Sequence, residues 1–323
     1  MATEHPHRHE SIRIAEEPAR SGDPPASKRR RPAPGRLRLT GRRPLRAGVL
    51  GAFSRILGAA RRLARTAEHD PVAAVHEYRK SLRRARALVA LLAPCLGKPA
   101  ALGLRRRLQA AFRATNALRD ADVLLETLRA VPPDAEDDLA RHAIEVALEL
   151  EQGRTRKETS ETLEGALQFL GGLPAALEVL LKPQFSTRDL ERGLTRSRQR
   201  ERRALEQAMK TRSDEDLHEW RKRVKELRYQ VELLASKGGG EIKRREKSLG
   251  RLAQDLGAVT DLIVLAREIG EREREGTVPA SPALKERIRE LAAKRSGPLL
   301  ELGAKLFEGD AKLFARQVLG ERG

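Results

Sequence analysis

The chain has 323 residues, of which 39% are hydrophobic and 34% charged, so it can bury a core beneath a heavily charged surface. Aromatic residues make up only 3%, while Ala, Leu, Arg and Glu are abundant, a composition that favours helices over strands. The formal net charge of +19 favours anionic partners such as nucleic acid, polyphosphate or an acidic membrane surface, without choosing among them. We therefore expect an all-α protein that binds an anion.

The cysteine content and the hydropathy pattern indicate the cellular compartment of the protein. The single cysteine, Cys95, excludes an intramolecular disulfide framework and a cysteine-rich zinc site, and it suits a reducing cytoplasm. No apolar run approaches the roughly 20 residues that cross a bilayer, and the N-terminus lacks the apolar stretch of a secretory signal. We expect a cytoplasmic protein without membrane insertion.

The first segment, residues 1–43, is rich in Pro, Gly, Ser and Arg and includes the run Lys28-Arg29-Arg30-Arg31. Its prolines interrupt any helical period, which predicts a disordered basic tail. Such a tail either adds non-specific attraction to a polyanion or is a solvated segment without a dedicated role. Nuclear import is a further interpretation of the basic run.

From Pro44 onward, apolar residues recur at helical spacing and predict a series of helices. Asp70 before Pro71, and Ser213 before Asp214, have the pattern of helix N-caps. The predicted breaks between helices fall at Asp70-Pro71, Pro94 to Pro99, Pro132-Pro133, Gly171-Gly172, Pro183, Ser213-Asp214, Gly238-Gly239-Gly240, Pro279 to Pro282 and Gly297.

An internal repeat divides this helical part in two. His76-Glu77-Tyr78-Arg79-Lys80 reappears as His218-Glu219-Trp220-Arg221-Lys222, and a second block around Asp120 reappears around Asp261 in the same order. Repetition of whole blocks is the signature of duplicated structural units. It predicts two related halves, residues 44–183 and 184–323.

Each half has one helix with a basic face opposite an apolar face. At 100° per residue, the basic residues after each repeated histidine fall within an arc of about 120°, and Val, Leu and Ala occupy the other side. Tyr78 and Trp220 lie with the apolar set, where packing is their simplest role. The two basic faces comprise His76, Arg79, Lys80, Arg83 and Arg86 in the first half, and His218, Arg221, Lys222, Lys225 and Arg228 in the second.

The basic faces indicate a bound polyanion. Like charges at i,i+4 destabilise an isolated helix, so helix stability alone does not select them, whereas a bound anion reverses the repulsion. The face from His76 to Arg86 is about 15 Å long, enough to follow several consecutive phosphates. Neighbouring phosphates would also favour the imidazolium form of each histidine, which donates from both ring nitrogens.

At these residues the sequence resembles the CHAD family of histidine-containing α-helical domains. The resemblance rests on the two His-centred blocks and the two Asp-centred blocks, and it covers nearly all of the chain after the tail. It implies two pseudo-symmetric bundles of about four long helices each, with a central basic groove or pore that binds inorganic polyphosphate. Some members of the family are associated with polyphosphate granules.

The family pattern also implies that the helix before each histidine contributes basic side chains, which Arg61 and Arg203 fit. Further candidate contacts are Arg105, Arg106 and Arg113 in the first half, and Arg244, Lys247 and Arg251 in the second. A carboxylate aimed at phosphate would repel it, so we expect Asp120 and Asp261 to be structural and to orient basic residues. We expect neither a metal nor a cofactor.

Two other functions remain open from the sequence. His76 or His218 could carry a phosphoryl group, but no nucleotide-binding loop, metal cluster or response-regulator motif accompanies them, and we expect no enzyme. Nucleic-acid binding is the stronger alternative, because phosphate contacts dominate affinity for any polyanion. The basic faces offer few groups that read base edges or stack bases, so we expect such binding to be non-specific.

Overall fold

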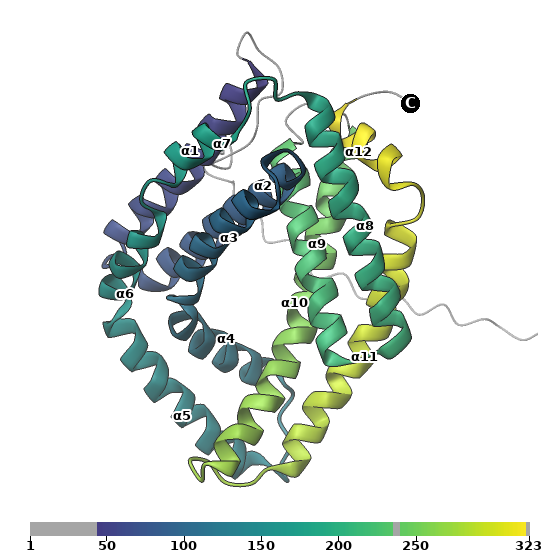
Figure 1. The fold of residues 1–323 in the computed structure, drawn as a ribbon. Coiled ribbons are helices and arrows are strands. Elements are labelled where there is room, and N and C mark those ends of the chain that lie inside the picture. The colour runs from purple at the N-terminus through teal and green to yellow at the C-terminus, as the bar shows by residue number, and fades with distance from the viewer. Residues whose placement is uncertain (1–43, 235–239, 321–323) are drawn as a thin grey trace, which may run out of the picture. The chain divides into compact units, whose positions relative to one another are not determined.

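In the computed structural model, the described residues are 44–234 and 240–320, and all of them belong to one compact unit. Every regular element among these residues is a helix, which confirms the all-α prediction (Figure 1). The predicted basic tail, residues 1–43, and most of the predicted break at Gly238-Gly239-Gly240 lie outside the described residues.

The first half of the chain contains helices α1 to α7 and one short 3-10 helix. Their bounds are α1 Leu45–Arg65, α2 Pro71–Leu96, α3 Lys98–Arg113, α4 Asn116–Ala130, α5 Asp138–Lys157, α6 Thr159–Ala166, η1 Leu167–Leu170 and α7 Leu173–Leu180. The repeated histidine block lies on α2, and the Asp120 block spans the start of α4.

The second half contains helices α8 to α12, with bounds α8 Thr187–Thr211, α9 Asp214–Leu234, α10 Gly240–Arg274, α11 Pro282–Leu306 and α12 Ala311–Leu319. The repeat is visible in their order, because α9 carries the second histidine block and α10 carries the Asp261 block. The halves differ at one junction: the first has a break at Thr115 between α3 and α4, whereas α10 runs through the matching residues without interruption.

Local capping agrees with the sequence at two helix starts. The Asp70 side chain accepts a hydrogen bond from the backbone N–H of Ala73 at 3.0 Å, and Ser213 Oγ accepts one from Asp216 N–H at 3.2 Å. Side-chain acceptors at these positions satisfy donors that the first turn of a helix leaves free. Both N-cap predictions are confirmed.

The break predicted at Pro94 to Pro99 is confirmed at Gly97, where φ is +80°, and Pro94 itself lies inside α2, which continues to Leu96. The break predicted at Gly297 is wrong. Gly297 lies inside α11, with Pro298 after it. Helix α11 buries Ile288, Ala292 and Leu300 on both sides of this dipeptide. Packing of a continuous apolar face therefore outweighs the low helix propensity of Gly and Pro.

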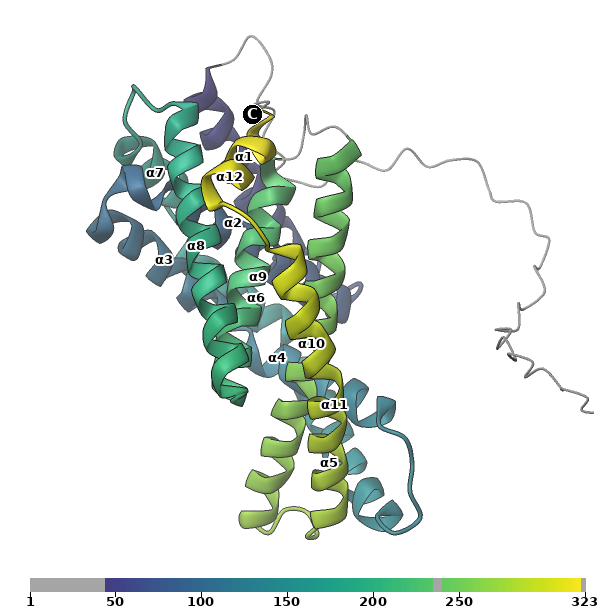
Figure 2. The ribbon, with the colours of Figure 1, turned by 90° about the vertical axis from the view of Figure 1, so that its right-hand side faces the viewer.

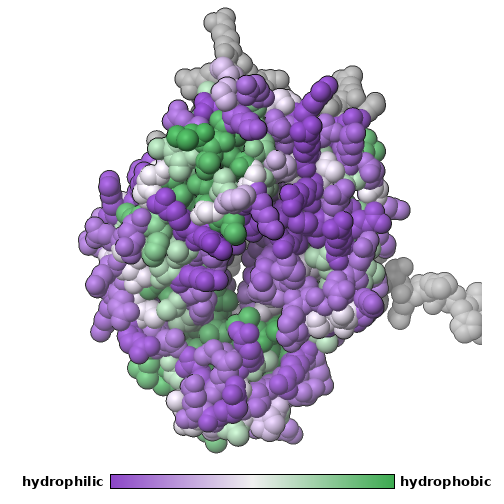
Figure 3. All heavy atoms as spheres, viewed as in Figure 1, coloured by the Kyte–Doolittle hydropathy of each residue, from purple (hydrophilic) through white to green (hydrophobic). Residues whose placement is uncertain are grey.

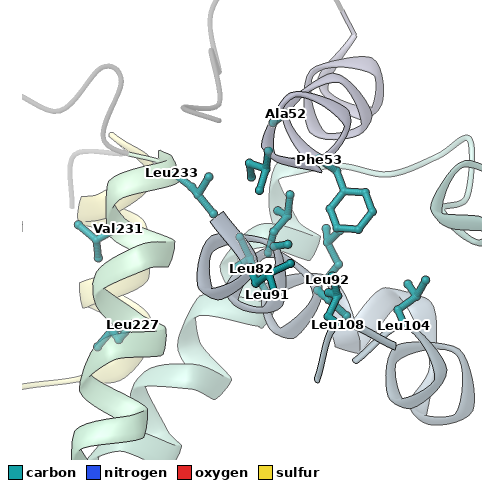
Figure 4. Packing of buried hydrophobic residues seen from close by; sticks show 14 of the residues in the cluster. Ala52, Phe53, Leu82, Leu91, Leu92, Leu104, Leu108, Leu227, Val231 and Leu233 are labelled. Atoms are coloured by element: carbon teal, nitrogen blue, oxygen red, sulfur yellow. The ribbon is translucent and has the colours of Figure 1, made fainter. Parts of the chain in front are cut away.

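The main hydrophobic core is shared by the two halves, and α2 contributes many of its residues. Figure 4 shows Leu91 and Leu92 of α2 in the same cluster as Phe53 of α1 and Leu233 of α9. The repeated aromatic residues Tyr78 and Trp220 are fully buried, as expected for packing. A second cluster joins α4 and α5 to α10 and α11. The halves are thus packed together and share one core.

One segment departs from the hydropathy expectation. Residues Thr159–Leu180 are long and apolar enough, by length and composition, to cross a membrane. In the structure this segment is divided into α6, η1 and α7, with a break at Gly171 and Gly172. Leu163 and Leu177 within it are fully buried in the shared core.

Candidate polyanion-binding cavity

The basic faces of α2 and α9 line one cavity, with a volume of about 540 Å³, which α3, α4 and α10 complete. Figure 3 shows a hollow near the middle of this face of the molecule, bordered by hydrophilic residues. The basic lining residues are Arg79, Arg83, Arg86, Arg105, Arg119, His218, Arg221, Lys222, Arg223, Lys225 and Arg267, and the acidic ones are Asp120, Glu226 and Asp261. The side chains that line the cavity therefore have a strongly positive net charge.

Most residues of the two predicted faces reach this cavity. Those that line it are Arg79, Arg83 and Arg86 from the first half, and His218, Arg221, Lys222 and Lys225 from the second. His76, Lys80 and Arg228 are absent from the lining. Lys80 is paired with Glu77 at 3.0 Å, and His76 lies 4.0 Å from the same carboxylate. The Arg228 guanidinium lies 5.5 Å from the ring of Tyr229.

The additional candidates divide into three groups. Arg105 lines the cavity. Arg61 instead donates to the carbonyl of Leu170 at 3.1 Å, and Arg203 lines a separate groove along α8. The other candidates are exposed and contribute to neither hollow: Arg106, Arg113, Arg244, Lys247 and Arg251.

Sequence reasoning missed several lining residues. Arg119 precedes Asp120 within the repeated block, but its counterpart before Asp261 is Thr260, so the repeat gives no signal for it. The remaining missed side chains with charge or an aromatic ring are Phe112, Arg223, Glu226, Tyr229 and Arg267. Matching of the repeats selects residues common to both halves and overlooks those that only one half supplies.

Arg79 is held firmly at the break between α3 and α4. Its Nη1 donates to the carbonyl of Thr115 at 2.8 Å, to Thr115 Oγ1 and Asn116 Oδ1 at 3.1 Å each, and to the carbonyl of Phe112 at 3.3 Å. Burial, followed by repulsion from Arg83, lowers the pKa of Arg79 to about 9. The guanidinium donates hydrogen bonds to carbonyls at the end of α3. Arg79 therefore holds this wall of the cavity in place and also adds positive charge to it.

Phe112 forms a platform beneath three arginines of α2. Its ring centroid lies 4.0 Å from the guanidinium carbon of Arg79, 5.3 Å from that of Arg83 and 5.4 Å from that of Arg86. Each guanidinium is attracted to the negative face of the ring. The ring therefore gathers cations that would otherwise repel one another.

Several cations of the cavity have no carboxylate within ion-pair distance among the described residues. They are Arg83, Arg86, Arg105, Arg119 and Lys225. Burial is the largest cause that lowers the pKa of Lys225 to about 6, and repulsion from Arg221 and Arg83 adds to it. Burial likewise lowers the pKa of Arg86 and Arg119. The cavity thus concentrates basic side chains whose charge an anion would stabilise.

The two histidines are shifted in the same direction. Burial lowers the pKa of His218, and the charges of Lys222 and Arg221 lower it further. Burial also lowers the pKa of His76, although Glu77 partly opposes the shift. The lowered pKa favours the neutral form of both imidazoles, and a negative charge nearby would oppose this shift.

The carboxylates that face the cavity behave differently from one another. Asp261 Oδ1 lies 3.5 Å from Arg221 Nη2, within ion-pair distance of a basic side chain of the cavity. Asp120 lines the cavity and has no ion pair in the described part of the chain. Glu226 pairs with Arg200 of α8 at 2.8 Å. No group of three or more His, Cys, Asp or Glu that could hold a metal occurs within residues 44–234 and 240–320.

Comparisons with known proteins agree with this architecture. A family model described as the CHAD domain matches residues 47–270. Among solved structures, the CHAD domain from the plant Ricinus communis has a TM-score of 0.55 and 20% sequence identity, over 85% of this chain and 90% of that chain. At this identity the likeness concerns the fold. A search of curated proteins gives no match.

Proposed function

The chain belongs to the CHAD domain family, and from the geometry of its central cavity we propose that it binds inorganic polyphosphate. The observation that carries the proposal is the convergence of unpaired cations from both halves, such as Arg83, Arg86 and Lys225, around one volume. A polymer with one negative charge at every unit neutralises several of these cations together. A single phosphate would reach only a few of them.

The proposed role is binding, without a chemical step. On this account the protein is cytoplasmic and attaches to polyphosphate granules through the same cavity. Neutral Lys225 and His218, which both line the cavity, would gain protons as the polymer enters, which adds charge–charge attraction to the hydrogen bonds.

Nucleic acid is the second candidate, because it presents the same phosphate chemistry on a wider polymer. The cavity itself disfavours it: Phe112 is already covered by three guanidinium groups, so its ring is not free to stack on a base. A volume of about 540 Å³ also suits a thin chain without bases. Nucleic-acid binding is thus expected to be weaker and non-specific.

Competition at equal phosphate concentration tests the proposal. Polyphosphate should displace labelled single-stranded DNA from the full chain, and DNA should fail to displace labelled polyphosphate. The triple variant Arg83→Ala, Arg86→Ala and Lys225→Ala should lose polyphosphate binding while circular dichroism stays native. The proposal is wrong if this variant binds as the parent does, or if DNA wins the competition.

A matched control separates the cavity from the general field of a basic protein. The exposed residues Lys294, Arg295 and Lys305 on α11 line neither hollow, so replacing all three by Ala removes the same charge elsewhere. Polyphosphate affinity of this control should stay within about twofold of the parent, the range expected for rim charges under salt screening.

A further inference from the structure

A second basic hollow lies along α8 and α12, outside the cavity described above. Its volume is about 790 Å³, and Figure 2 shows α12 lying along α8 at this side of the molecule. The basic residues that line it are Arg188, Arg192, Arg196, Arg200 and Arg203 of α8, with Lys312 and Arg316 of α12. We call this surface the α8 groove.

The α8 residues of the groove form a straight row. From Arg188 to Arg203 the row is about 22 Å long at 1.5 Å per residue. Arg188, Arg192 and Arg196 follow one another at i,i+4 spacing, and repulsion between such like charges destabilises an isolated helix. A bound polyanion would offset this repulsion.

Few of these cations are neutralised within the described residues. Arg192 lies 3.8 Å from Asp189, and Arg316 lies 3.2 Å from Glu191. Neither ion pair involves Arg196, Arg203 or Lys312, which are exposed and have no carboxylate partner in the described ranges. The groove keeps a net positive charge along its length.

The groove and the cavity meet at one ion pair. Arg200 lines the groove, Glu226 lines the cavity, and Arg200 Nη2 lies 2.8 Å from Glu226 Oε1. Arg223, which also lines the cavity, approaches the other oxygen of Glu226 at 4.0 Å. Burial lowers the pKa of Arg200, and the charges of Arg223 and Arg105 on the cavity side contribute to the shift. Arg200 thus links two positive surfaces.

We propose that the α8 groove is an extension of the binding site, in which a polyphosphate chain that leaves the cavity beside Arg200 continues over Arg196, Arg203 and Lys312. This inference rests on the proposed function of the cavity. It assigns the groove to recognition of chain length: an oligomer that fills the cavity does not reach it, and a long polymer does.

Affinity measured with two polymer lengths tests the extension. The full-chain variant Arg196→Ala, Arg203→Ala and Lys312→Ala should bind tripolyphosphate as the parent does, and should bind long-chain polyphosphate roughly tenfold more weakly. The slope of log affinity against log salt for the long polymer should also become shallower by about 2, since three contacts are lost. The α11 triple variant serves as the charge-matched control.

The possible outcomes separate the extension from the cavity hypothesis. If the groove variant binds both lengths like the parent while the cavity variant loses both, the extension is wrong and the cavity proposal stands. If the groove variant and the α11 control weaken long-chain binding equally, the general field explains the effect and the extension is again wrong. If the cavity variant keeps full affinity for tripolyphosphate, the proposed function itself fails.

Discussion

Arg84 of α2 and Glu232 of α9 form a buried ion pair across the interface between the two halves, with 3.0 Å between Nε and Oε1. The two side chains are only 5% and 12% exposed. Gln230 of α9 adds a hydrogen bond from its Nε2 to the carbonyl of Ala87 at 3.1 Å. Because α2 and α9 also carry the two basic faces, these contacts fix the distance between the two faces.

Removal of one partner of this pair should be costly. Arg84→Ala leaves the Glu232 carboxylate buried without its partner, and should lower the free energy of unfolding by about 3–5 kcal/mol. Chemical denaturation followed by circular dichroism measures the change. Arg202→Ala is the control, because Arg202 and Glu206 form an exposed ion pair on α8 that should contribute less than about 1 kcal/mol. Equal losses in the two variants would contradict this account.

A close approach of α8 to α2 should make Gly193 irreplaceable. A Cβ at this position would lie 1.9 Å from the carbonyl oxygen of Leu91, so Gly193→Ala must push the helices apart. We expect destabilisation of about 3 kcal/mol or more, since backbone must move. Gly153→Ala on α5 meets no atom within 4 Å and should stabilise the protein by about 0.5–1 kcal/mol. Thermal unfolding of both variants decides the point: a Gly193→Ala protein as stable as the parent would show that α8 and α2 do not approach this closely.

Lys225 should destabilise the folded protein while it contributes to polyphosphate binding. Its pKa falls from 10.5 to about 6 in the folded protein. Between these pH values the unfolded chain binds more protons at Lys225 than the folded protein does, so the free energy of unfolding increases with pH. Lys225→Met removes the cost of the buried amine and should raise Tm by about 2–4 °C, a shift typical of ~1 kcal/mol. The gain should be larger at pH 6 than at pH 9, and polyphosphate affinity should fall. A lower Tm at pH 6 would show that the buried amine does not destabilise the fold.

Polyphosphate binding should take up protons. Phosphate charge would raise the lowered pKa values of Lys225 and His218 in the cavity, so affinity should increase as pH falls from 8 to 6. Calorimetry at pH 7 in buffers of different ionisation enthalpy measures the uptake directly. The Lys225→Arg variant stays charged, so it should take up fewer protons on binding than the parent. The difference between the two proteins gives the proton uptake of Lys225, apart from protons taken up by the polymer itself. Identical uptake in the two proteins would exclude Lys225 as the acceptor.

The sequence predicted the helical class, and its repeated histidine blocks pointed to α2 and α9, because duplication repeats the residue types that both helices carry. It could not predict which other helices close the cavity. Arg119 and Arg267 reach it from α4 and α10, although their counterparts, Thr260 and Glu126, are not basic. A helical wheel gives the direction of a side chain around one axis, whereas the crossing point of two helices decides which turns face each other.

The same limit explains the predicted residues that lie elsewhere. His76 and Lys80 have the right direction on the wheel but are paired with Glu77 away from the cavity lining. Arg61 and Arg203 occupy matching positions in the repeat, yet Arg61 donates to a carbonyl at the end of η1 and Arg203 lines the α8 groove. Equivalent positions in a repeat acquire different neighbours once the two halves pack against each other.

On the proposed function, both halves hold one polyphosphate chain in a single shared cavity. Titration calorimetry of the full chain with tripolyphosphate measures this on the parent, on Arg83→Ala with Arg86→Ala, and on Lys222→Ala with Lys225→Ala. We expect one oligomer bound per protein, and loss of most of the affinity in each double variant, because each removes one wall of the same site. Two oligomers per protein, with each double variant retaining one site at parental affinity, would contradict it.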